Sequence, residues 1–455
     1  MVGPSAEGPR RRGPDDPTIG PDGSGEYPRK RGLNASRTGA GSPSARGPSP
    51  RPVMMVAMTG TGTARGGSVA EVFWVFLRLG LTSFGGPVAH LAYFREAFVE
   101  RRRWLTDAAY ADLVALCQFL PGPGSSQVGM VIGLRRAGPA GLLAAWVAFT
   151  LPSAILLVAF AYGVAAFGDV ADAGWLHGVK AAAVAVVAQA VIQMARTLTP
   201  DLKRIVIAAV GVAVLLVVAS PVAQVGVIVL GGLIGWLWLR ADQPETVRDL
   251  ARVSHRSGIV ALVLFAVLLV SLPILVALTN DPTLRLADIF YRTGALVFGG
   301  GHVVLPLLEA QTVQAGLVDA DTFLAGYGAA QAVPGPLFTF SAYLGASMES
   351  GPSGVLGASI ALVAVFLPAG LLVVGVLPFW DRLRQAPTAR RVVMGVNAAV
   401  VGILAAALYD PVITQGIISW GTLAVAVAVF VSQWWGRVPI WLAVVAAGVL
   451  GQLLL

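Results

Sequence analysis

The chain has 455 residues, of which 56% are hydrophobic and 12% are charged, and its formal net charge is +8. Its mean hydropathy of +0.74 is far above that of soluble globular domains, so the composition excludes a soluble enzyme and indicates a polytopic membrane protein. The single cysteine, Cys117, excludes an intramolecular disulfide framework and is expected to be a small packing residue. No CxxC pair or histidine-rich stretch points to a metal site, and no cofactor is expected.

Residues 1–66 are rich in Pro, Gly, Ser and Arg and contain few large aliphatic side chains. Such a segment cannot bury enough apolar surface to offset its ordering entropy, so we predict a disordered basic tail. A basic tail beside a membrane span is typical of the cytoplasmic side, and we expect no nucleic-acid partner. The tail lacks the apolar core of a signal peptide, and Met54, Met55 and Met58 leave a later start open.

Two segments recur in order along the chain. FLRLGLTSFGG (76–86) aligns with FYRTGALVFGG (290–300), and CQFLPGP (117–123) aligns with AQAVPGP (330–336). Matches in the same order at nearly constant spacing indicate two homologous halves.

Two further matches extend the repeat. Pro152 aligns with Pro368, and GVKAAAV (178–184) aligns with GVNAAVV (395–401). Lys180 of this match is expected at the flank of its helix. The predicted organisation is a tail (1–66), a first repeat (67–240), a linker with an extra transmembrane helix (241–284) and a second repeat (285–455).

The charges of the loops predict the orientation of each half, because basic loops lie mostly in the cytoplasm. In the first half the loop at Arg135 and Arg136 is basic, and the loop with Asp169 and Asp172 is acidic. In the second half the counterpart of the first loop carries Glu349, and that of the second is the basic WDRLRQAPTARR. The exchanged signs predict an all-α fold with antiparallel, inverted-topology halves, an architecture found in secondary transporters.

One loop does not fit a simple count of spans. REAFVERRRW (95–104) falls outside if the preceding segment crosses fully. Either an interfacial helix tolerates these outer arginines, or broken helices at SFGGP and LPGPGSS re-enter and return them to the inside. We favour re-entry, which is permitted where protein or a water-filled cavity covers the backbone.

The two breaks carry the candidate chemistry. Paired glycines interrupt a helix at low steric cost, and Pro87 suits the first turn of the helix that restarts. Pro121 and Pro123 stop a second helix, and Ser125 or Ser126 can cap the next one. The positive ends of such half-helices form an anion site made of backbone amides.

Charged and titratable residues near the breaks have two readings each. Arg78 and Arg292 occupy matched positions in apolar segments and either join the anion site or snorkel to the interface. His90 and His302 follow the breaks without being repeat-equivalent, and are either polar fillers or proton-coupling groups. The predicted substrate-binding residues are Arg78, Ser83, Phe84, Gly85, Gly86, His90, Gln118, Pro121, Gly122, Ser125, Ser126, Gln127, Arg292, Phe298, Gly299, Gly300, His302, Gln331, Pro334 and Gly335.

The paired motifs resemble those of the chromate ion transporter family in its long-chain, two-half form. The similar segments are residues 76–105, 117–146, 298–308 and 326–346, and the resemblance extends over residues 68–455. It implies a multi-pass protein of the bacterial cytoplasmic membrane that exports chromate and confers chromate resistance, with the proton motive force as an option. Independently of the resemblance, a membrane potential that is negative inside favours export of a dianion, so we expect the potential to drive transport.

Several alternatives stay open beside the resemblance. Sulfate has the same shape and charge as chromate, so sulfate or another oxyanion is an alternative substrate, and a passive anion channel would use the same architecture. The lipid bilayer is the other expected partner, and a homodimer is an option. A membrane enzyme is not expected, because the sequence shows no clustered acid, base or nucleophile.

Overall fold

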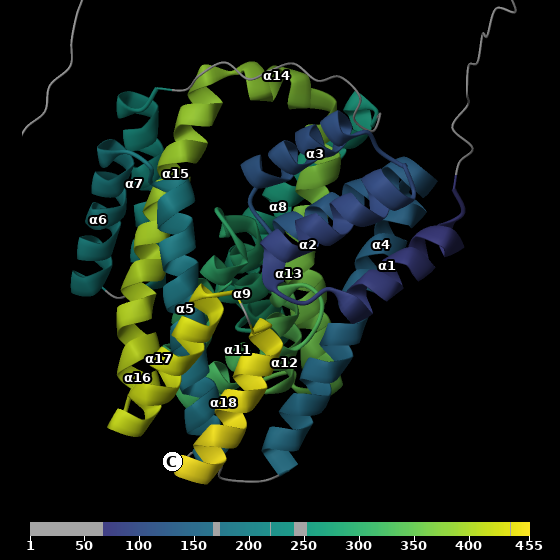
Figure 1. Cartoon of the computed structure of the whole chain (residues 1–455). Helices are drawn as coiled ribbons and strands as arrows, with labels where there is room; N and C mark the ends of the chain where they lie inside the picture. The colour runs from purple at the N-terminus through teal and green to yellow at the C-terminus, as the bar shows by residue number, and fades with distance from the viewer. Residues whose placement is uncertain (1–66, 167–172, 219, 241–252, 437) are drawn as a thin grey trace, which may run out of the picture. The chain divides into compact units, whose positions relative to one another are not determined.

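The computed structural model describes residues 67–166, 173–218, 220–240, 253–436 and 438–455, and this part of the chain contains helices and no strand. The predicted tail, the loop with Asp169 and Asp172, and residues 241–252 of the linker lie outside the described residues. Six of the described helices are long and apolar enough to cross a membrane. The predicted all-α polytopic class is therefore confirmed (Figure 1).

The first half begins with three short helices. They are α1 (Val69–Thr82), α2 (Gly86–Arg95), which continues into the π-helical turn Glu96–Arg101, and α3 (Asp107–Phe119). At 1.5 Å per residue, the longest continuous stretch, α2 with its π-helical turn, measures at most about 24 Å, whereas a hydrocarbon core is about 30 Å thick. Each helix is therefore too short to cross a membrane alone.

Both ends of the α1–α2 hairpin lie on the same side of the molecule. The Gly67 N–H donates to the carbonyl of Arg136 at 3.0 Å, and the Arg136 guanidinium lies 4.8 Å from the ring centroid of Trp104. The start of α1 and the loop after α2 therefore both adjoin the Arg135–Arg136 segment, and we call this side the arginine-rich side. The chain turns at FGG and returns, which is the re-entrant alternative.

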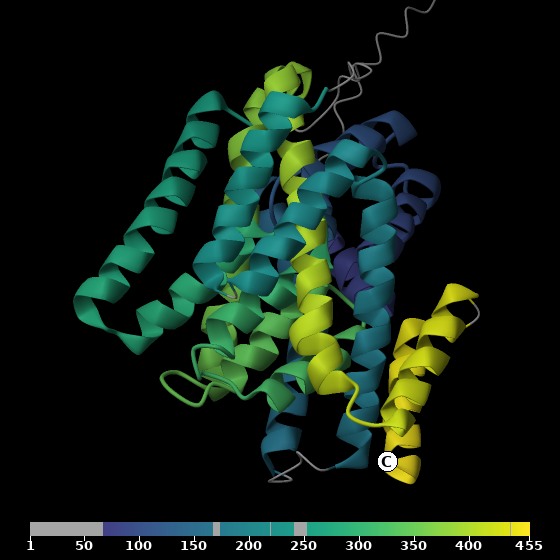
Figure 2. The same ribbon diagram turned by 90° about the vertical axis from the view of Figure 1, so that its left-hand side faces the viewer.

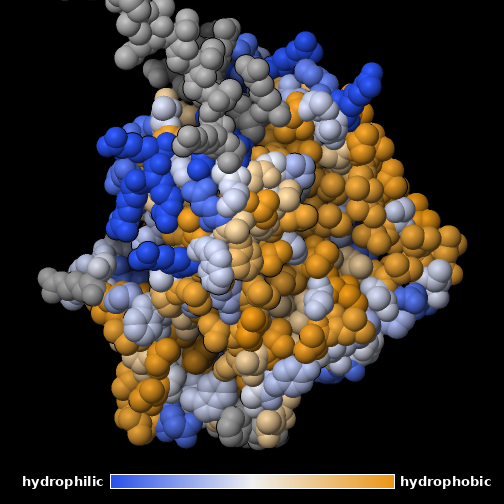
Figure 3. Space-filling view, turned by 90° about the vertical axis from the view of Figure 1, so that its right-hand side faces the viewer, coloured by the Kyte–Doolittle hydropathy of each residue, from blue (hydrophilic) through white to orange (hydrophobic). Residues whose placement is uncertain are grey.

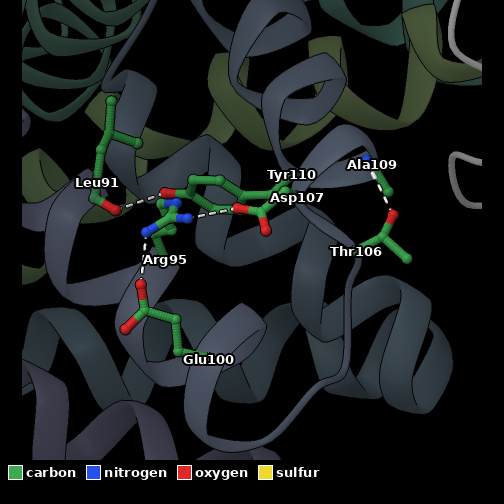
Figure 4. Close-up of polar contacts among 7 residues, drawn as sticks. All are labelled: Leu91, Arg95, Glu100, Thr106, Asp107, Ala109 and Tyr110. Atoms are coloured by element: carbon green, nitrogen blue, oxygen red, sulfur yellow. Dashed lines mark hydrogen bonds and ion pairs between the residues drawn. The ribbon is translucent and has the colours of Figure 1, made fainter.

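Contacts of α2 with the following turn and with α3 hold Arg95 in place (Figure 4). Arg95 pairs with Glu100 at 2.5 Å and with Asp107 at 2.7 Å. The Tyr110 hydroxyl donates to the carbonyl of Leu91 at 2.7 Å. Acidic residues of the same segment thus compensate part of the positive charge that made this loop difficult to place from sequence.

The helix after the PGP break has two arms. In α4 (Gly124–Ala166), Ala137 and Gly138 have non-helical backbone angles just before Pro139. The first arm returns from the break to the arginine-rich side, and the second arm runs to the opposite side. The arms pack closely, because a β-carbon at Gly133 would lie only 2.3 Å from the carbonyl oxygen of Gly141.

The second half repeats these elements in the same order. They are α9 (Pro282–Leu296), the 3₁₀ turn Gly301–Val303 with α10 (Val304–Thr312), α11 (Ala320–Ala332), the 3₁₀ turn Leu337–Thr339 with α12 (Phe340–Ala346), and α13 (Gly354–Val376).

The second half is inverted relative to the first. A β-carbon on Gly354, where α13 begins, would lie 2.6 Å from the hydroxyl of Tyr162, near the end of α4. After α13, the turn Leu377–Phe379 and α14 (Trp380–Gln385) follow, and Trp380 Nε1 donates to the Asp112 carboxylate on α3 at 3.2 Å. Since α13 begins where α4 ends and finishes beside α3, the predicted antiparallel halves are confirmed.

Asp112 also forms a buried ion pair that links the halves, and it supports a stability prediction. Its carboxylate lies 3.1 Å from Arg384 Nη1, and the two side chains are only 9% and 5% exposed. We expect Asp112→Ala to lower the free energy of unfolding by about 3 kcal/mol, because it leaves a buried guanidinium undercompensated. Asp381, the other partner of Arg384 at 2.8 Å, is 71% exposed, so Asp381→Ala should cost much less. Thermal unfolding of the purified variants tests this order, and equal losses would contradict it.

Each half also contributes a helical hairpin that packs on the other half. The helices α5 (Gly174–Leu198) and α15 (Pro387–Ala407) are the repeat-equivalent centres. The hairpin α6 (Leu202–Val217) with α7 (Pro221–Trp238) packs on α15, and α17 (Trp420–Trp434) with α18 (Ile440–Leu454) packs on α5 (Figure 1). The turns Leu408–Ile413 and α16 (Thr414–Gly416) connect α15 to α17.

Glycines permit the close packing of α18 on α5 and of α7 on α15. A β-carbon at Gly178 of α5 would lie 2.0 Å from the carbonyl oxygen of Ala447, and one at Gly395 of α15 would lie 2.1 Å from that of Gly231. Since Gly178 and Gly395 are repeat-equivalent, the same close contact is used twice.

The extra helix predicted in the linker is α8 (His255–Thr279). Only 6% of its most apolar 18-residue stretch is buried. Figure 2 shows α8 at one edge of the molecule, leading into α9. Figure 3 shows a broad hydrophobic surface with hydrophilic residues gathered toward its upper end, as expected of a protein embedded in lipid. As an odd helix between the repeats, α8 supplies the inversion.

Candidate functional site

The broken segments of the two halves cross each other. The Gly122 N–H, in the PGP break of the first half, donates to the carbonyl of Val297 at 2.7 Å, just before FGG of the second half. The Gly335 N–H, in the PGP break of the second half, donates to the carbonyl of Ser83 at 2.9 Å, just before FGG of the first. The two hydrogen bonds are repeat-equivalent, so we call this region the crossing.

The glycines of the PGP breaks are required by backbone conformation and by space. Gly122 has φ of +118° and Gly335 has φ of +103°, which residues with a side chain rarely adopt. A β-carbon at Gly335 would lie 2.7 Å from Ser153 Oγ, and one at Gly122 would lie 3.2 Å from Ala369 Cβ. Ser153 directly follows Pro152 on α4, and Ala369 directly follows the matched Pro368 on α13. The two helices therefore pack against the PGP breaks at repeat-equivalent positions.

The FGG glycines turn the chain at the tip of each hairpin. Gly85 and Gly86 have φ of +98° and +76°, and Gly299 and Gly300 have φ of +76° and +148°. Helix α2 begins at Gly86 with Pro87 in its first turn, as expected. The first-turn amides of α2 therefore start at the tip of the first hairpin, where they favour an anion, whereas the 3₁₀ turn Gly301–Val303 separates the second tip from α10.

Polar side chains of the first half gather at the crossing. His90 is fully buried and lies between the carbonyl oxygen of Ser83, 3.2 Å from Nε2, and Ser125 Oγ, 3.3 Å from Nδ1. Gln127 Nε2 donates to the carbonyl of Pro121 at 2.7 Å. The histidine thus ties the end of α1 to the start of α4.

Four buried polar groups of these segments have no hydrogen-bond partner among the described residues. They are the hydroxyls of Ser83 and Ser126, the side-chain oxygen of Gln127 and the side-chain nitrogen of Gln331. A buried polar group without a partner costs about 1–3 kcal/mol. Three of the four can donate, so they are suited to an acceptor ligand.

The second half contributes a different set of polar groups. His302 Nδ1 lies 2.8 Å from the hydroxyl of Tyr327, which is buried on α11. Gln331, near the end of α11, and Pro334, just beyond it, are buried, and Phe298, just beyond α9, is half-buried. The two copies of the site are therefore similar in backbone and different in side chains.

Several predicted site residues are exposed or lie at the edge of the crossing. Arg78 and Gln118 are exposed, and Gly85 is exposed at its tip. Arg78 lies on the opposite face of α1 from the buried Phe76 and Gly80, since two residues correspond to about 200° around a helix. Phe84 packs against Trp441 at 5.7 Å between ring centroids, at the edge of the crossing.

Arg292 is also separate from the crossing. It forms an ion pair with Asp288 on α9 and, together with Gln311, lines a groove of about 520 Å³ beside α7. The structure therefore does not bring the two matched arginines to the breaks. Periodicity could have indicated this for Arg78, because it falls outside the apolar stripe of α1 that faces the core.

Sequence reasoning misplaced Lys180. This residue is 4% exposed rather than at a solvated flank, and its ammonium lies 2.5 Å from Asp321 Oδ1 in the first turn of α11. The pair joins α5 of the first half to α11 of the second. The available signal was a lysine within a helix of small apolar residues, GVKAAAV, where a charge requires a partner.

Metal binding has no support in the described part of the chain, where no group of three His, Cys, Asp or Glu side chains is close enough to hold an ion. Cys117 on α3 is buried and belongs to a hydrophobic core cluster. The groups gathered at the crossing are backbone amides, hydroxyls, side-chain amides and the His90 imidazole.

Comparisons with known proteins point to one family. The family described as chromate transporter matches this chain twice, over residues 70–236 and 284–452. A chromate transport protein of Pseudomonas aeruginosa is 28% identical over 415 residues, which cover 85% of this chain and 92% of that relative. A chromate transport protein of Cupriavidus metallidurans is 29% identical over 367 residues, covering 79% and 86%.

A third relative, from Synechococcus elongatus, is named a probable chromate transport protein and is 28% identical over 350 residues, covering 75% of this chain and 84% of its own length. No solved structure matches the chain significantly.

Proposed function

This chain belongs to the chromate transporter family, and on that premise we propose that it carries chromate across the membrane through the crossing of its two broken segments. The single observation that carries the proposal is the repeated hydrogen bond between halves, from Gly122 to Val297 and from Gly335 to Ser83. Inverted-repeat transporters hold their substrate where broken helices of the two repeats meet.

The chemistry of the crossing suits a tetrahedral dianion. Ser83, Ser126 and Gln331 offer buried donors without partners, and the first turns of α2 and α4 add backbone N–H groups. Such neutral donors recognise an oxyanion without an opposing charge that would hold it too tightly to release. Arg78 and Arg292 lie outside this proposed site.

We place the arginine-rich side in the bacterial cytoplasm, following the distribution of basic loops. Export is then favoured by the membrane potential, since moving two negative charges outward gains about 4.6 kcal/mol per 100 mV. That energy sustains a gradient of about 2,000-fold at 100 mV. The energetics therefore need no proton, and export of this size would confer chromate resistance.

The repeat itself supplies a matched pair of variants for testing the site. Gln331 is buried with an unpartnered side-chain nitrogen, whereas its repeat-equivalent Gln118 is exposed. In everted vesicles with a fixed membrane potential, Gln331→Ala should raise the KM for chromate about tenfold, the worth of one good hydrogen bond. Gln118→Ala should leave KM unchanged. Equal effects of the two substitutions would remove Gln331 from the proposed site.

Sulfate is the second candidate substrate, because neutral donors recognise shape and charge that the two dianions share. Sulfate added to the same vesicles should compete with chromate uptake. If sulfate inhibits chromate uptake with an affinity equal to that of chromate, this chain is a general oxyanion transporter. Chromate uptake that does not saturate with rising chromate concentration would favour a channel.

A further inference from the structure

A groove of about 820 Å³ lies between α4, α8 and α13. Its rim includes Leu143, Val363 and Leu367, which are 57%, 49% and 39% exposed, so the groove opens sideways on the apolar surface. An opening of this kind meets lipid rather than water in a membrane-embedded protein. The residues that line it are different from those of the anion site proposed above.

The two ends of the groove differ in chemistry. Arg135, Ser254 and Ser257 line the end on the arginine-rich side, where α8 begins with Ser254 as its N-cap. The other end is apolar and follows α13 from Val374 to Val363, a rise of about 16 Å for eleven residues. A positive helix end with an arginine favours an anion, and the apolar wall is long enough for much of an acyl chain.

The charges and the shape of the groove together suit one class of lipid. We propose that this groove binds one anionic phospholipid of the arginine-rich leaflet, with its phosphate near Arg135 and the start of α8, and one acyl chain along the apolar wall of α13. Trp146 forms part of the apolar wall, where its ring packs against Phe366.

The floor of the groove adjoins the crossing. Met130 lies one helical turn after Gln127, and Gly370 directly follows Ala369, which backs Gly122. A bound acyl chain therefore packs behind the helices that support the crossing. Delipidated protein should lose thermal stability and transport rate together.

The test uses the purified full-length protein with phosphatidylglycerol or phosphatidylcholine, and native mass spectrometry of the retained lipid. Phosphatidylglycerol should be retained in one copy, with a preference of at least about fivefold over phosphatidylcholine, the effect of one basic residue at an anionic headgroup. Arg135→Gln should remove that preference. Arg102→Gln, which neutralises an exposed arginine of a neighbouring loop, should keep it.

A second variant blocks the acyl end. A β-carbon at Gly370 would have only Met130 Sδ nearby, at 3.9 Å, so Gly370→Leu should fill the floor without a backbone clash and abolish lipid retention. Gly163→Leu is the control, because Gly163 lies at an open position of α4 and does not line the groove.

Three results would overturn the lipid site. Lipid retention at the wild-type level in Gly370→Leu would show that the acyl chain lies elsewhere. If Gly370→Leu fails to fold, an unchanged preference for phosphatidylglycerol in Arg135→Gln would show that the headgroup does not bind at this groove. Displacement of the lipid by inorganic phosphate alone would make this a phosphate site instead.

Discussion

Replacing Gly335 with alanine should abolish chromate transport. The substitution forces a side chain into φ of +103°, at a cost of about 1–3 kcal/mol, and brings its β-carbon to 2.7 Å from Ser153 Oγ and 3.3 Å from the carbonyl oxygen of Phe149. Relief of that contact would move the PGP break and lengthen the hydrogen bond to Ser83. Uptake into everted vesicles, normalised to the amount of folded protein in the membrane, measures the loss.

Matched variants separate the crossing from simple backbone strain. Gly316 has φ of +66° with nothing within 4 Å of its β-carbon position, so Gly316→Ala imposes the strain without the clash. It should keep most of the transport activity. Gly122→Ala should have an intermediate effect, because the nearest atom, Gln127 Nε2 at 3.0 Å, belongs to a longer side chain that can move.

A partial rescue would strengthen the assignment. Ser153→Ala removes the hydroxyl nearest to the new methyl group, so the double variant with Gly335→Ala should recover part of the lost uptake. Wild-type transport by Gly335→Ala alone would show that the crossing is not part of the transport path.

Removing Asp321 should destabilise the protein more than removing its partner Lys180. The Lys180 side chain is 5% exposed and that of Asp321 is 37% exposed. Asp321→Asn leaves an ammonium group buried without a countercharge, which should cost about 3–5 kcal/mol. Lys180→Met leaves a carboxylate that is partly solvated and lies in the first turn of α11, where the helix dipole favours it.

The expected order of thermal unfolding midpoints is wild type, then Lys180→Met, then Asp321→Asn. The double variant should resemble Lys180→Met, because it removes the buried charge as well as its partner. Asp107→Asn, which breaks the exposed pair with Arg95, is the control and should have little effect. A larger loss in Lys180→Met than in Asp321→Asn would contradict the assignment of Lys180 as the buried member.

Much of the architecture was predictable from short local patterns. The paired FGG and PGP segments predicted where helices break, and the structure has α2 and α4 restarting after those glycines and prolines. The exchanged loop charges predicted the inversion that Asp112 and Trp380 now show by contact. Glycine and proline act on the backbone within a few residues, so their consequences can be read locally.

The site residues were predictable to different degrees. Ser126, His90 and Gln331 lie at the breaks and are buried, as the motifs suggested. Arg78 and Gln118 occupy matched positions in the sequence but face away, because adjacency to a break says nothing about which face of a short helix is covered. The burial of Lys180 depended on Asp321, which is 141 residues away along the chain.

The sequence alone determined that the chain is a membrane protein of two inverted halves, and where each half is broken, because hydropathy, loop charge and glycine-proline chemistry are local properties. Only the tertiary structure decided that each PGP break meets the FGG break of the other half, through Gly122 to Val297 and Gly335 to Ser83. A PGP break that met the FGG break of its own half would have the same repeat pattern in sequence. The pairing between halves therefore depends on how their helices pack against each other.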